Sequence, residues 1–392
     1  MNYWSNKITY KIEFALSIPF VLIGKIFAIF SNLKGNYSTI IFSPNGDIGG
    51  SIKVNSDLLS CFEGKTLVIF TKKQKNNLYI NRFKKTNAHI IDISQYIDNK
   101  YLHIINLIFR GIIVSWIKKY NIKNIVGGEC IYFYKIIPHL SNKYNKIEIC
   151  HVDNWLNYSV RFIEDISYRV FSTNYLKNKV IEQYNKFKIP SHFYKKLIHI
   201  ENSIQIPDKY IQKEQNKIQV YFIGRGTKQK RADLACSIAR EIHKVNNNVE
   251  FTFIGDLNNV IKTNDFPFIN FLGNINDEQL MQLHYQKADI LLMTSQFEGL
   301  PLTIMEMMSY GKTIISTGVS AIPDYIKDGE NGFLINSKED NCIIEDGKQK
   351  IINLIENPLK LRKFGEINRE FAVTNFDKKY FCLNYSKLLD YR

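Results

Sequence analysis

Residues 294–315, TSQFEGLPLTIMEMMSYGKTII, contain the pattern from which the fold can be predicted. The apolar run Ile290–Met293 before them is typical of a buried parallel strand, and a second apolar run closes the stretch. Pro301 suits the first position of a helix because its φ is already helical and its missing N–H is not needed there. Gly311 suits the left-handed residue that ends a helix. The stretch therefore predicts a strand, a loop, a helix from about Pro301 to Tyr310 and another strand.

Two glutamates lie on either side of the expected helix start. Glu298 falls in the loop and Glu306 on the second helical turn, with seven residues between them. A helix N-terminus attracts phosphate, and neighbouring carboxylates can bind hydroxyls, so the pair indicates a nucleotide sugar. Both glutamates could instead be ordinary surface acids. However, Met305 and Met307 flank Glu306 in a helix that is apolar nearly all round, where a carboxylate needs a partner.

Length and composition limit the class of protein. The 392 residues predict two domains, and 45% hydrophobic with 23% charged residues is typical of a globular protein. A formal net charge of +15 favours anionic partners, which include phosphorylated substrates, an anionic membrane surface and nucleic acid. Nucleic acid is the weakest of these because the sequence has no RNA-binding signature or zinc-finger spacing. The six cysteines form no CxxC pair, which predicts reduced core thiols in a cytosolic protein.

Residues 14–30, FALSIPFVLIGKIFAIF, are the most apolar part of the chain. They are short for a membrane-spanning helix, which needs about 20 residues, and Lys25 would lie within the span. Glu13 and the lack of a convincing cleavage pattern disfavour a signal peptide. We therefore expect residues 1–35 to form an anchor at the membrane interface rather than a buried N-terminal helix. Its lysines would meet anionic headgroups: Lys7, Lys11, Lys25 and Lys34.

From residue 36 onward, strand-like and helix-length segments alternate, which is typical of a parallel sheet covered on both faces. The expected strands of the first half are Thr39–Ser43, Thr66–Thr71, Ala88–Ile93, Lys123–Val126, Ile147–His151, Arg169–Thr173 and Leu197–Ile200. Ligands of such sheets bind at the carboxyl ends of the strands.

Two features lie at such strand ends. The turn Ser43–Ser51 is rich in glycine, and Gly49 and Gly50 let the backbone approach a ligand closely. The turn matches neither a Walker loop nor GxGxxG, so a plain turn is the alternative. His151 also lies at a strand end and is expected to face the ligand, although a lone histidine is more often structural.

A second alternation begins after Pro207–Asn216, which we interpret as the linker between domains. Its first strand, Ile218–Ile223, leads into the basic turn GRGTKQKR at residues 224–231. Arg225 and Lys230 in this turn would lie at the same sheet edge as the two glutamates and could clamp a diphosphate. A solvated basic loop is the alternative.

Together these residues resemble a known family. The stretch from Phe297 to Gly311, with seven residues between its two glutamates, is similar to the signature of the retaining family 4 glycosyltransferases. The supporting segments are Gly224-Arg225 with Lys230, Ile254-Gly255-Asp256, Leu272-Gly273 and Asp328-Gly329 to Gly332-Phe333. The resemblance is strongest over residues 200–335 and weaker over residues 36–200. It departs from the family pattern at Ser203, where glycine is usual, and at Ser320-Ala321, where a glycine pair is common.

The resemblance implies an α/β protein of GT-B architecture, with two Rossmann-like domains whose parallel sheets face each other across a cleft. It implies an acceptor domain over residues 36–206 and a nucleotide-sugar domain over residues 207–370. Residues 371–392 would form a C-terminal helix that packs back on the first domain.

Roles carried over by position divide the two glutamates. Glu306 would hold the ribose hydroxyls of the donor and Glu298 a hydroxyl of the donor sugar. The backbone amides near Gly299 and Leu300 would assist.

The remaining carried-over residues concern the leaving group and the opposite domain. Arg225 and Lys230 would stabilise the diphosphate that departs. Gly49 and Gly50 would line the phosphate side of the cleft, and His151 would lie near the reactive face of the donor sugar.

The resemblance implies sugar transfer from a UDP- or GDP-linked donor, with retention of anomeric configuration and with no metal or other cofactor. Basic charge and the apolar N-terminus predict a lipid-linked or cell-envelope glycan as acceptor, and a cytoplasmic protein bound peripherally to the cytoplasmic face of the membrane. The alternatives are a glycoside hydrolase that uses Glu298 and Glu306, a sugar-nucleotide epimerase of the same architecture, and a non-catalytic protein that binds membranes or polyanions. Nucleotide binding would disfavour the hydrolase, and isomerisation without acceptor would identify the epimerase.

Overall fold

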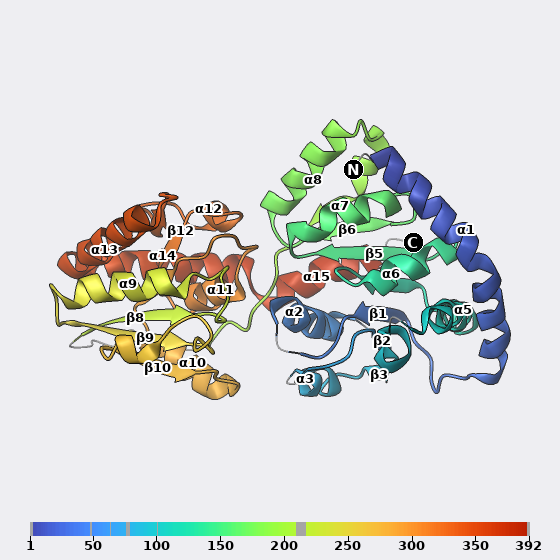
Figure 1. Ribbon diagram of the computed structural model, residues 1–392, viewed down its shortest axis with the longest axis horizontal. Coiled ribbons are helices and arrows are strands. Elements are labelled where there is room, and N and C mark those ends of the chain that lie inside the picture. Colours follow the sequence, from blue (N-terminus) through green and yellow to red (C-terminus); the bar gives the residue numbers. More distant parts are fainter. Residues whose placement is uncertain are drawn as a thin grey trace. The chain divides into compact units, whose positions relative to one another are not determined.

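The computed structural model describes residues 3–47, 49–62, 64–75, 79–99, 101–208 and 217–389. The chain divides into two compact units (Figure 1). Unit 1 comprises Met1–Asn202 and Lys379–Arg392, and unit 2 comprises Ser203–Lys378. Of the predicted linker at residues 207–216, only Pro207 and Asp208 lie within the described residues.

The sheet of unit 1 has seven parallel strands in the order β3-β2-β1-β4-β5-β6-β7. Their bounds are β1 Thr39–Ser43, β2 Thr66–Phe70, β3 His89–Asp92, β4 Asn124–Gly127, β5 Asn145–Cys150, β6 Tyr168–Phe171 and β7 Leu197–His199. All seven strands predicted for this half are confirmed, with ends that differ by at most two residues. Thr39 pairs with both Thr66 and Asn124, so β1 is an interior strand of the sheet and its whole apolar run is buried.

Helices connect these strands and cover the sheet. They are α1 Tyr3–Phe27, α2 Gly50–Leu58, α3 Ile80–Lys84, α4 Ser94–Ile97, α5 His103–Lys119, α6 Ile131–Ile136, α7 Leu156–Ser159, α8 Asn174–Lys186 and the C-terminal α15 Lys378–Leu389. α15 contributes to unit 1 from Lys379 onward, and the side-chain amide of Asn145 on β5 donates a hydrogen bond of 3.0 Å to the Leu388 carbonyl.

The N-terminal helix α1 packs on α5 at the outside of unit 1 (Figure 1). The contact is close because both helices have a glycine there. A Cβ on Gly24 would lie 1.9 Å from the Ile108 carbonyl oxygen, and one on Gly111 would lie 2.1 Å from the Val21 carbonyl oxygen. Away from α5, α1 and the short 3₁₀ turn after it expose large apolar side chains: Ile8, Ile12, Leu16, Leu22, Ile26, Ile29 and Phe30.

Unit 2 repeats the design with a six-stranded parallel sheet in the order β10-β9-β8-β11-β12-β13. The strands are β8 Ile218–Ile223, β9 Val249–Ile254, β10 Ile269–Gly273, β11 Ile290–Met293, β12 Thr313–Thr317 and β13 Gly332–Ile335. The helices are α9 Ala232–His243, α10 Glu278–Lys287, α11 Leu302–Ser309, α12 Ile322–Tyr325, α13 Asp340–Glu356 and α14 Pro358–Asn375. Two α/β units with parallel sheets confirm the predicted fold class.

A charged pair lies inside unit 1. Glu148 on β5 and Arg169 on β6 are both fully buried and bonded to each other through Arg169 Nε. Hydroxyl groups complete the network: Tyr134 donates to Glu148 over 2.6 Å, and Arg169 donates to Ser159 and Tyr184 over 2.6 and 3.0 Å. A buried pair of this kind is sustained because its remaining hydrogen-bonding groups are satisfied.

The prediction that all six cysteines are reduced core thiols is wrong. Cys61 and Cys382 form a disulfide, with Cα atoms 4.6 Å apart. The 321 residues between them concealed the pair, because only the return of α15 to unit 1 brings the two together. Cys130, Cys150 and Cys236 are free and buried as expected, whereas Cys342 is exposed.

Candidate active site

The strand order of unit 2 places two long loops at the same sheet edge. β8 lies beside β11, although two strands and two helices separate them in sequence, and this is the point where the strand order reverses. The basic turn at residues 224–231 follows β8, and the loop at residues 294–301 follows β11. Such a switch point at the carboxyl ends of parallel strands is where ligands bind in sheets of this type.

Lys230 and Glu298 meet at this edge. Lys230 Nζ lies 2.5 Å from Glu298 Oε1, and the two side chains are 13% and 8% exposed. The Glu298 amide donates a 3.2 Å hydrogen bond to the Ser320 hydroxyl. Ser320 has a φ of 52°, which explains why glycine is common at this position in the family that the sequence resembles.

Hydrogen bonds to backbone carbonyls hold the two loops together. The Gln296 amide donates to the Gln229 carbonyl over 2.8 Å, and the Gln229 side chain donates to the Phe297 carbonyl over the same distance. Arg231 Nε donates to the Thr294 carbonyl over 2.7 Å, and the Thr294 hydroxyl donates to the Arg231 carbonyl, also over 2.7 Å. The position of the Lys230–Glu298 pair is therefore determined by the main chain on both sides.

Two glycines allow the basic turn to approach the neighbouring loop after β9. A Cβ on Gly255, whose φ is 135°, would lie 1.9 Å from the Gly224 carbonyl oxygen. A Cβ on Gly226 would lie 2.2 Å from the Asp256 carbonyl oxygen, which accepts the Gly226 amide over 3.0 Å. Arg225, between the two glycines of the turn, is exposed.

Helix α11 begins one residue later than predicted. Pro301 has a φ of −62° and a ψ of 131°, so it caps the helix instead of occupying its first turn, and the helix covers Leu302–Ser309. The predicted stop is present, because Gly311 adopts a left-handed φ of 65°. Gly299 and Leu300 lie immediately before this N-terminus, where the first amides of the helix cannot bond within it.

Glu306 is half-buried on α11, and the partner expected for it exists. The Tyr285 hydroxyl on α10 donates a hydrogen bond to Glu306 Oε2. Burial, followed by the charge of Glu306, raises the pKa of Tyr310 nearby. Glu298 and Glu306 thus have different partners, a cation for the first and a phenol for the second.

The other predicted site residues belong to unit 1 and lie at the carboxyl edge of its sheet. Gly49 precedes α2, and its carbonyl accepts the Lys53 amide over 2.9 Å, so Gly50 occupies the first helical turn after β1. His151 directly follows β5. Burial lowers the pKa of His151 to about 4, so its imidazole is neutral.

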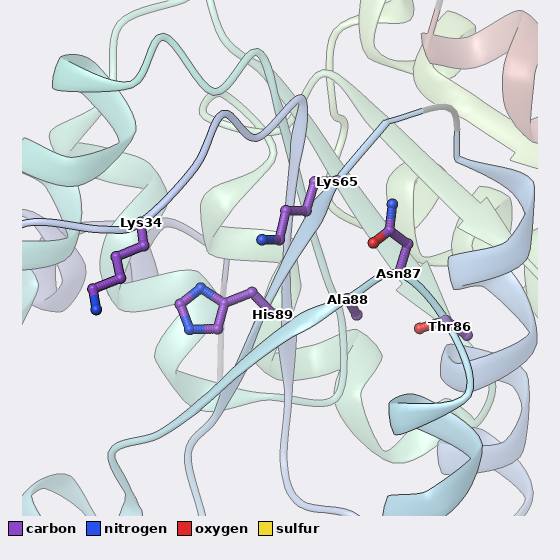
Figure 2. Close-up of a pocket in the computed structure, with 6 residues that line it drawn as sticks. All are labelled: Lys34, Lys65, Thr86, Asn87, Ala88 and His89. Carbon is purple, nitrogen blue, oxygen red and sulfur yellow. The ribbon is translucent and has the colours of Figure 1, made fainter.

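A hollow of about 340 Å³ lies at a different edge of unit 1, near the beginning of β3 (Figure 2). Its lining residues are Lys34, Lys65, Thr86, Asn87, Ala88 and His89. Since β3 begins at His89, this hollow is at the amino end of that strand, away from the strand ends that carry the predicted site residues.

Sequence reasoning missed several residues of the edge in unit 2. Arg231 and Gln229 were not separable from the other polar residues of the turn, and Tyr285 lies in a helix that carried no motif. Ser320 was noticed only as a departure from a glycine pattern, and its left-handed φ is the structural counterpart of that signal.

Comparison with known proteins confirms the resemblance. Residues 205–371 match the family described as glycosyl transferases group 1, which is nearly all of unit 2. An uncharacterized glycosyltransferase of Methanocaldococcus jannaschii is 26% identical over 75% of this chain and 87% of its own. An uncharacterized 41.2 kDa protein of the cps region of Klebsiella pneumoniae is 28% identical over 54% of this chain, and the match spans 55% of its length.

Solved structures show the same fold. The Anabaena protein HepE, solved in complex with UDP and glucose, superposes with a TM-score of 0.69 at 14% identity, over 91% of this chain and all of its own. At this identity the similarity establishes the fold. Residues 205–371 of unit 2 are thus similar to the group 1 glycosyltransferases, and the described parts of both units have the GT-B type of architecture.

Proposed function

We propose that this protein, a glycosyltransferase of the group 1 family by its unit 2, transfers a sugar from a nucleoside diphosphate sugar to a glycan or lipid-linked acceptor with retention of configuration. The observation that carries the proposal is the Lys230–Glu298 pair at the edge where the strand order of unit 2 reverses. A carboxylate that binds sugar hydroxyls and a cation that binds phosphate are in contact there. Both halves of a nucleotide sugar are thus provided for at one place.

The pair can exchange partners when the donor binds. A diphosphate would attract the Lys230 ammonium, and a donor hydroxyl would donate a hydrogen bond to the Glu298 carboxylate. The attraction between the two side chains would be replaced by the attraction of Lys230 to the diphosphate and by the hydroxyl hydrogen bond to Glu298. Arg225 is exposed in the same turn and adds a second cation for the leaving group.

Leaving-group stabilisation is the catalytic step that these residues support. As the glycosidic bond breaks, negative charge grows on the diphosphate, and fixed cations lower the energy of that state more than the energy of the bound donor. Lys230 and Arg225 can do this without a metal ion. The departing phosphate would then take the proton of the attacking hydroxyl on the same face, which retains the configuration.

Binding of the nucleoside portion is assigned to the other glutamate. Glu306 would accept hydrogen bonds from the ribose hydroxyls, with its carboxylate oriented by Tyr285. HepE contains UDP, which makes UDP-linked sugars the first donors to test, followed by GDP-linked sugars. Gly49, Gly50 and His151 are assigned to the side of the donor that unit 1 would contact.

A donor screen tests the proposal. Purified protein is incubated with UDP- and GDP-sugars and a membrane-lipid extract, and released nucleotide is measured. We expect release that requires an acceptor and that falls strongly in Arg225→Ala but not in Lys228→Ala, a control lysine exposed in the same turn. Isomerisation of the free donor without acceptor would instead identify an epimerase. Lack of binding to any nucleotide sugar would contradict the proposal.

The N-terminal helix provides the second part of the proposal, that unit 1 docks on an anionic membrane surface. Ser5–Phe30 is long and apolar enough to cross a membrane, with a mean hydropathy of 2.0, but this alone is weak evidence. One side of α1 is packed on α5, while its outer side is apolar and exposed, which favours an orientation in the membrane plane. Lys11 and Lys34 are exposed and can meet headgroups. Lys7 is less available than predicted, because it pairs with Glu164 over 2.5 Å.

Vesicle flotation tests the docking. We expect the protein to float with vesicles that contain phosphatidylglycerol. With vesicles of phosphatidylcholine alone, it should stay in the bottom fraction. Leu16→Glu with Ile26→Glu should abolish flotation. Leu359→Glu, which changes an 81% exposed leucine of unit 2, is the control and should have no effect. Resistance of the bound protein to carbonate extraction would show a spanning helix instead.

A further inference from the structure

A tight loop after β4 brings a glutamate of unit 1 to the carboxyl edge of the sheet. The loop reads Gly127-Gly128-Glu129. A Cβ on Gly128 would lie 1.8 Å from the Ile149 carbonyl oxygen, and one on Gly127 would lie 2.6 Å from the Phe133 ring. Only glycine allows the loop to pack directly on the backbone of β5. Glu129 consequently lies at the end of β5, where the chain leaves the sheet.

The Glu129 carboxylate bridges two backbone amides at that point. Its Oε1 accepts hydrogen bonds of 2.8 Å from both the His151 amide and the Val152 amide. The backbone of Glu129 has a φ of 52°, a conformation that residues other than glycine seldom adopt. A connection between two strands requires neither a strained backbone nor a buried carboxylate. Backbone strain of this kind is concentrated at functional sites.

The imidazole of His151 lacks a partner of its own. Both ring nitrogens are buried and have no hydrogen-bond partner among the described residues. Buried polar atoms of proteins are nearly always bonded, so an unpaired ring at a ligand-binding edge is a group that a ligand can satisfy. A neutral imidazole offers one donor and one acceptor, which matches a hydroxyl group better than a phosphate.

We propose that Glu129 is a positioning residue that holds the His151 backbone so that the imidazole presents its nitrogens to a hydroxyl of a sugar substrate. The inference rests on the proposed function and adds to it a residue and a class of ligand group. Glu129 acts through the main chain, and His151 is the residue that touches the sugar.

The ionisation of the two groups agrees with this division. Burial raises the pKa of Glu129 to about 7, against the opposing effect of the two amides, and Glu148 raises it further. Burial, and then Glu148, raises the pKa of the neighbouring Cys150 thiol, and Glu129 adds to this rise. Either protonation state of Glu129 leaves an oxygen that can accept the two amides, so the holding role requires an acceptor and not a full charge.

A double-mutant cycle tests the proposal. Glu129→Ala and His151→Ala are each expected to lower kcat/KM by about tenfold to a hundredfold, because a displaced contact to substrate costs that much. The double variant should be no slower than His151→Ala alone. Glu129→Gln keeps an oxygen acceptor and should restore most of the activity. Glu182→Ala, a change of an exposed glutamate in unit 1, is the control.

Additive effects in the cycle, or full activity of Glu129→Ala, would overturn the proposal. Unfolding is excluded by requiring that each variant keep the thermal transition and the nucleotide affinity of the wild type.

A second measurement separates this proposal from the proposed function. The imidazole resonances of His151 are followed by NMR from pH 4 to 8 in protein that carries no substrate. In Glu129→Ala we expect the imidazole chemical shifts to change and the pKa of His151 to lie closer to its usual value. This result does not depend on whether a donor has been found. An unchanged His151 signal would overturn the role of Glu129, whereas failure of every donor with a changed signal would overturn only the proposed reaction.

Discussion

Units 1 and 2 have the same order of their first six strands, yet they keep their most buried ion pairs in different places. In unit 1, Glu148 and Arg169 lie within the sheet, are fully buried and have three hydroxyl partners. In unit 2, Lys230 and Glu298 lie in loops at the carboxyl edge and retain some exposure. A pair whose hydrogen bonds are all satisfied inside a sheet has nothing to offer a ligand. A pair at the edge can exchange its partners.

This difference separates stability from function. Burial of a charge is costly unless the partner is present, so the pair in unit 1 should matter for folding. The pair in unit 2 should matter for substrate binding and turnover, because either member can be solvated or bound by substrate when the other is absent. Variants that remove one cation from each unit should therefore differ in kind.

The largest effect on stability is expected for Arg169→Met. It leaves the Glu148 carboxylate fully buried without its cation, which should cost about 3–5 kcal/mol of unfolding free energy. Scanning calorimetry should show a lower transition temperature for unit 1. The double variant Arg169→Met with Glu148→Gln should recover part of the loss. A wild-type melting profile for the single variant would show that the pair is not structural.

Lys230→Met should reduce activity much more than stability. We expect kcat to fall by about 10²- to 10³-fold, because one of the groups that stabilise the leaving diphosphate is gone. The free energy of unfolding should fall by less than in Arg169→Met, since the Lys230–Glu298 pair keeps some exposure at the sheet edge, whereas the pair of unit 1 is fully buried. Kinetics and chemical denaturation on the same preparation measure both, with Lys228→Met as control. A large loss of stability at unchanged kcat would remove the contrast between the units.

Two buried groups of unit 1, Glu129 and His151, should make its stability depend on pH. The pKa of Glu129 is raised by burial to about 7, so the folded state retains a proton that the unfolded chain loses, and this stability disappears as the pH rises from 4.5 to 7. The pKa of His151 is lowered by burial to about 4, so its contribution is present above pH 6.5 and disappears as the pH falls. The two contributions oppose each other between pH 4.5 and 6.5.

Glu129→Gln removes one of these contributions. Unfolding free energy in this variant should rise with pH between 4.5 and 6.5, by at most about 3 kcal/mol, while the wild type stays nearly level. Urea denaturation at several pH values provides the measurement. Identical slopes for the two proteins would mean that the pKa of Glu129 does not change on folding.

The strands were predictable because each is a continuous apolar run, and such runs are typical of parallel strands buried on both faces. The edge of unit 2 was predictable in part, since Glu298 and Lys230 lie in loops that the alternation locates and Glu306 lies in the helix that follows. What could not be predicted depends on contacts between distant segments. Tyr285 reaches Glu306 from another helix, and Cys382 reaches Cys61 only because the last helix returns to unit 1.

The loop that carries Glu129 illustrates a different limit. The Gly127-Gly128 pair was visible in the sequence, but glycine pairs occur in many turns. Only the distance to the Ile149 carbonyl explains why two glycines are needed here. A residue that acts through backbone amides leaves no spacing pattern, because the amides it binds can belong to any sequence.

The smallest effect that still bears on the two units concerns Glu306. Glu306→Gln keeps the size of the side chain but replaces one carboxylate oxygen by an amide, which should weaken nucleotide binding by about tenfold, the equivalent of one charged hydrogen bond. Tyr285→Phe should have a smaller effect, because it removes only the hydroxyl that orients the carboxylate. Calorimetric titration with UDP and GDP measures both variants, and sugar transfer at saturating donor should be nearly normal in each. If Glu306→Gln instead lowered kcat and left nucleotide affinity unchanged, Glu306 would act on the transferred sugar, and the division of roles between the two glutamates of unit 2 would have to be reversed.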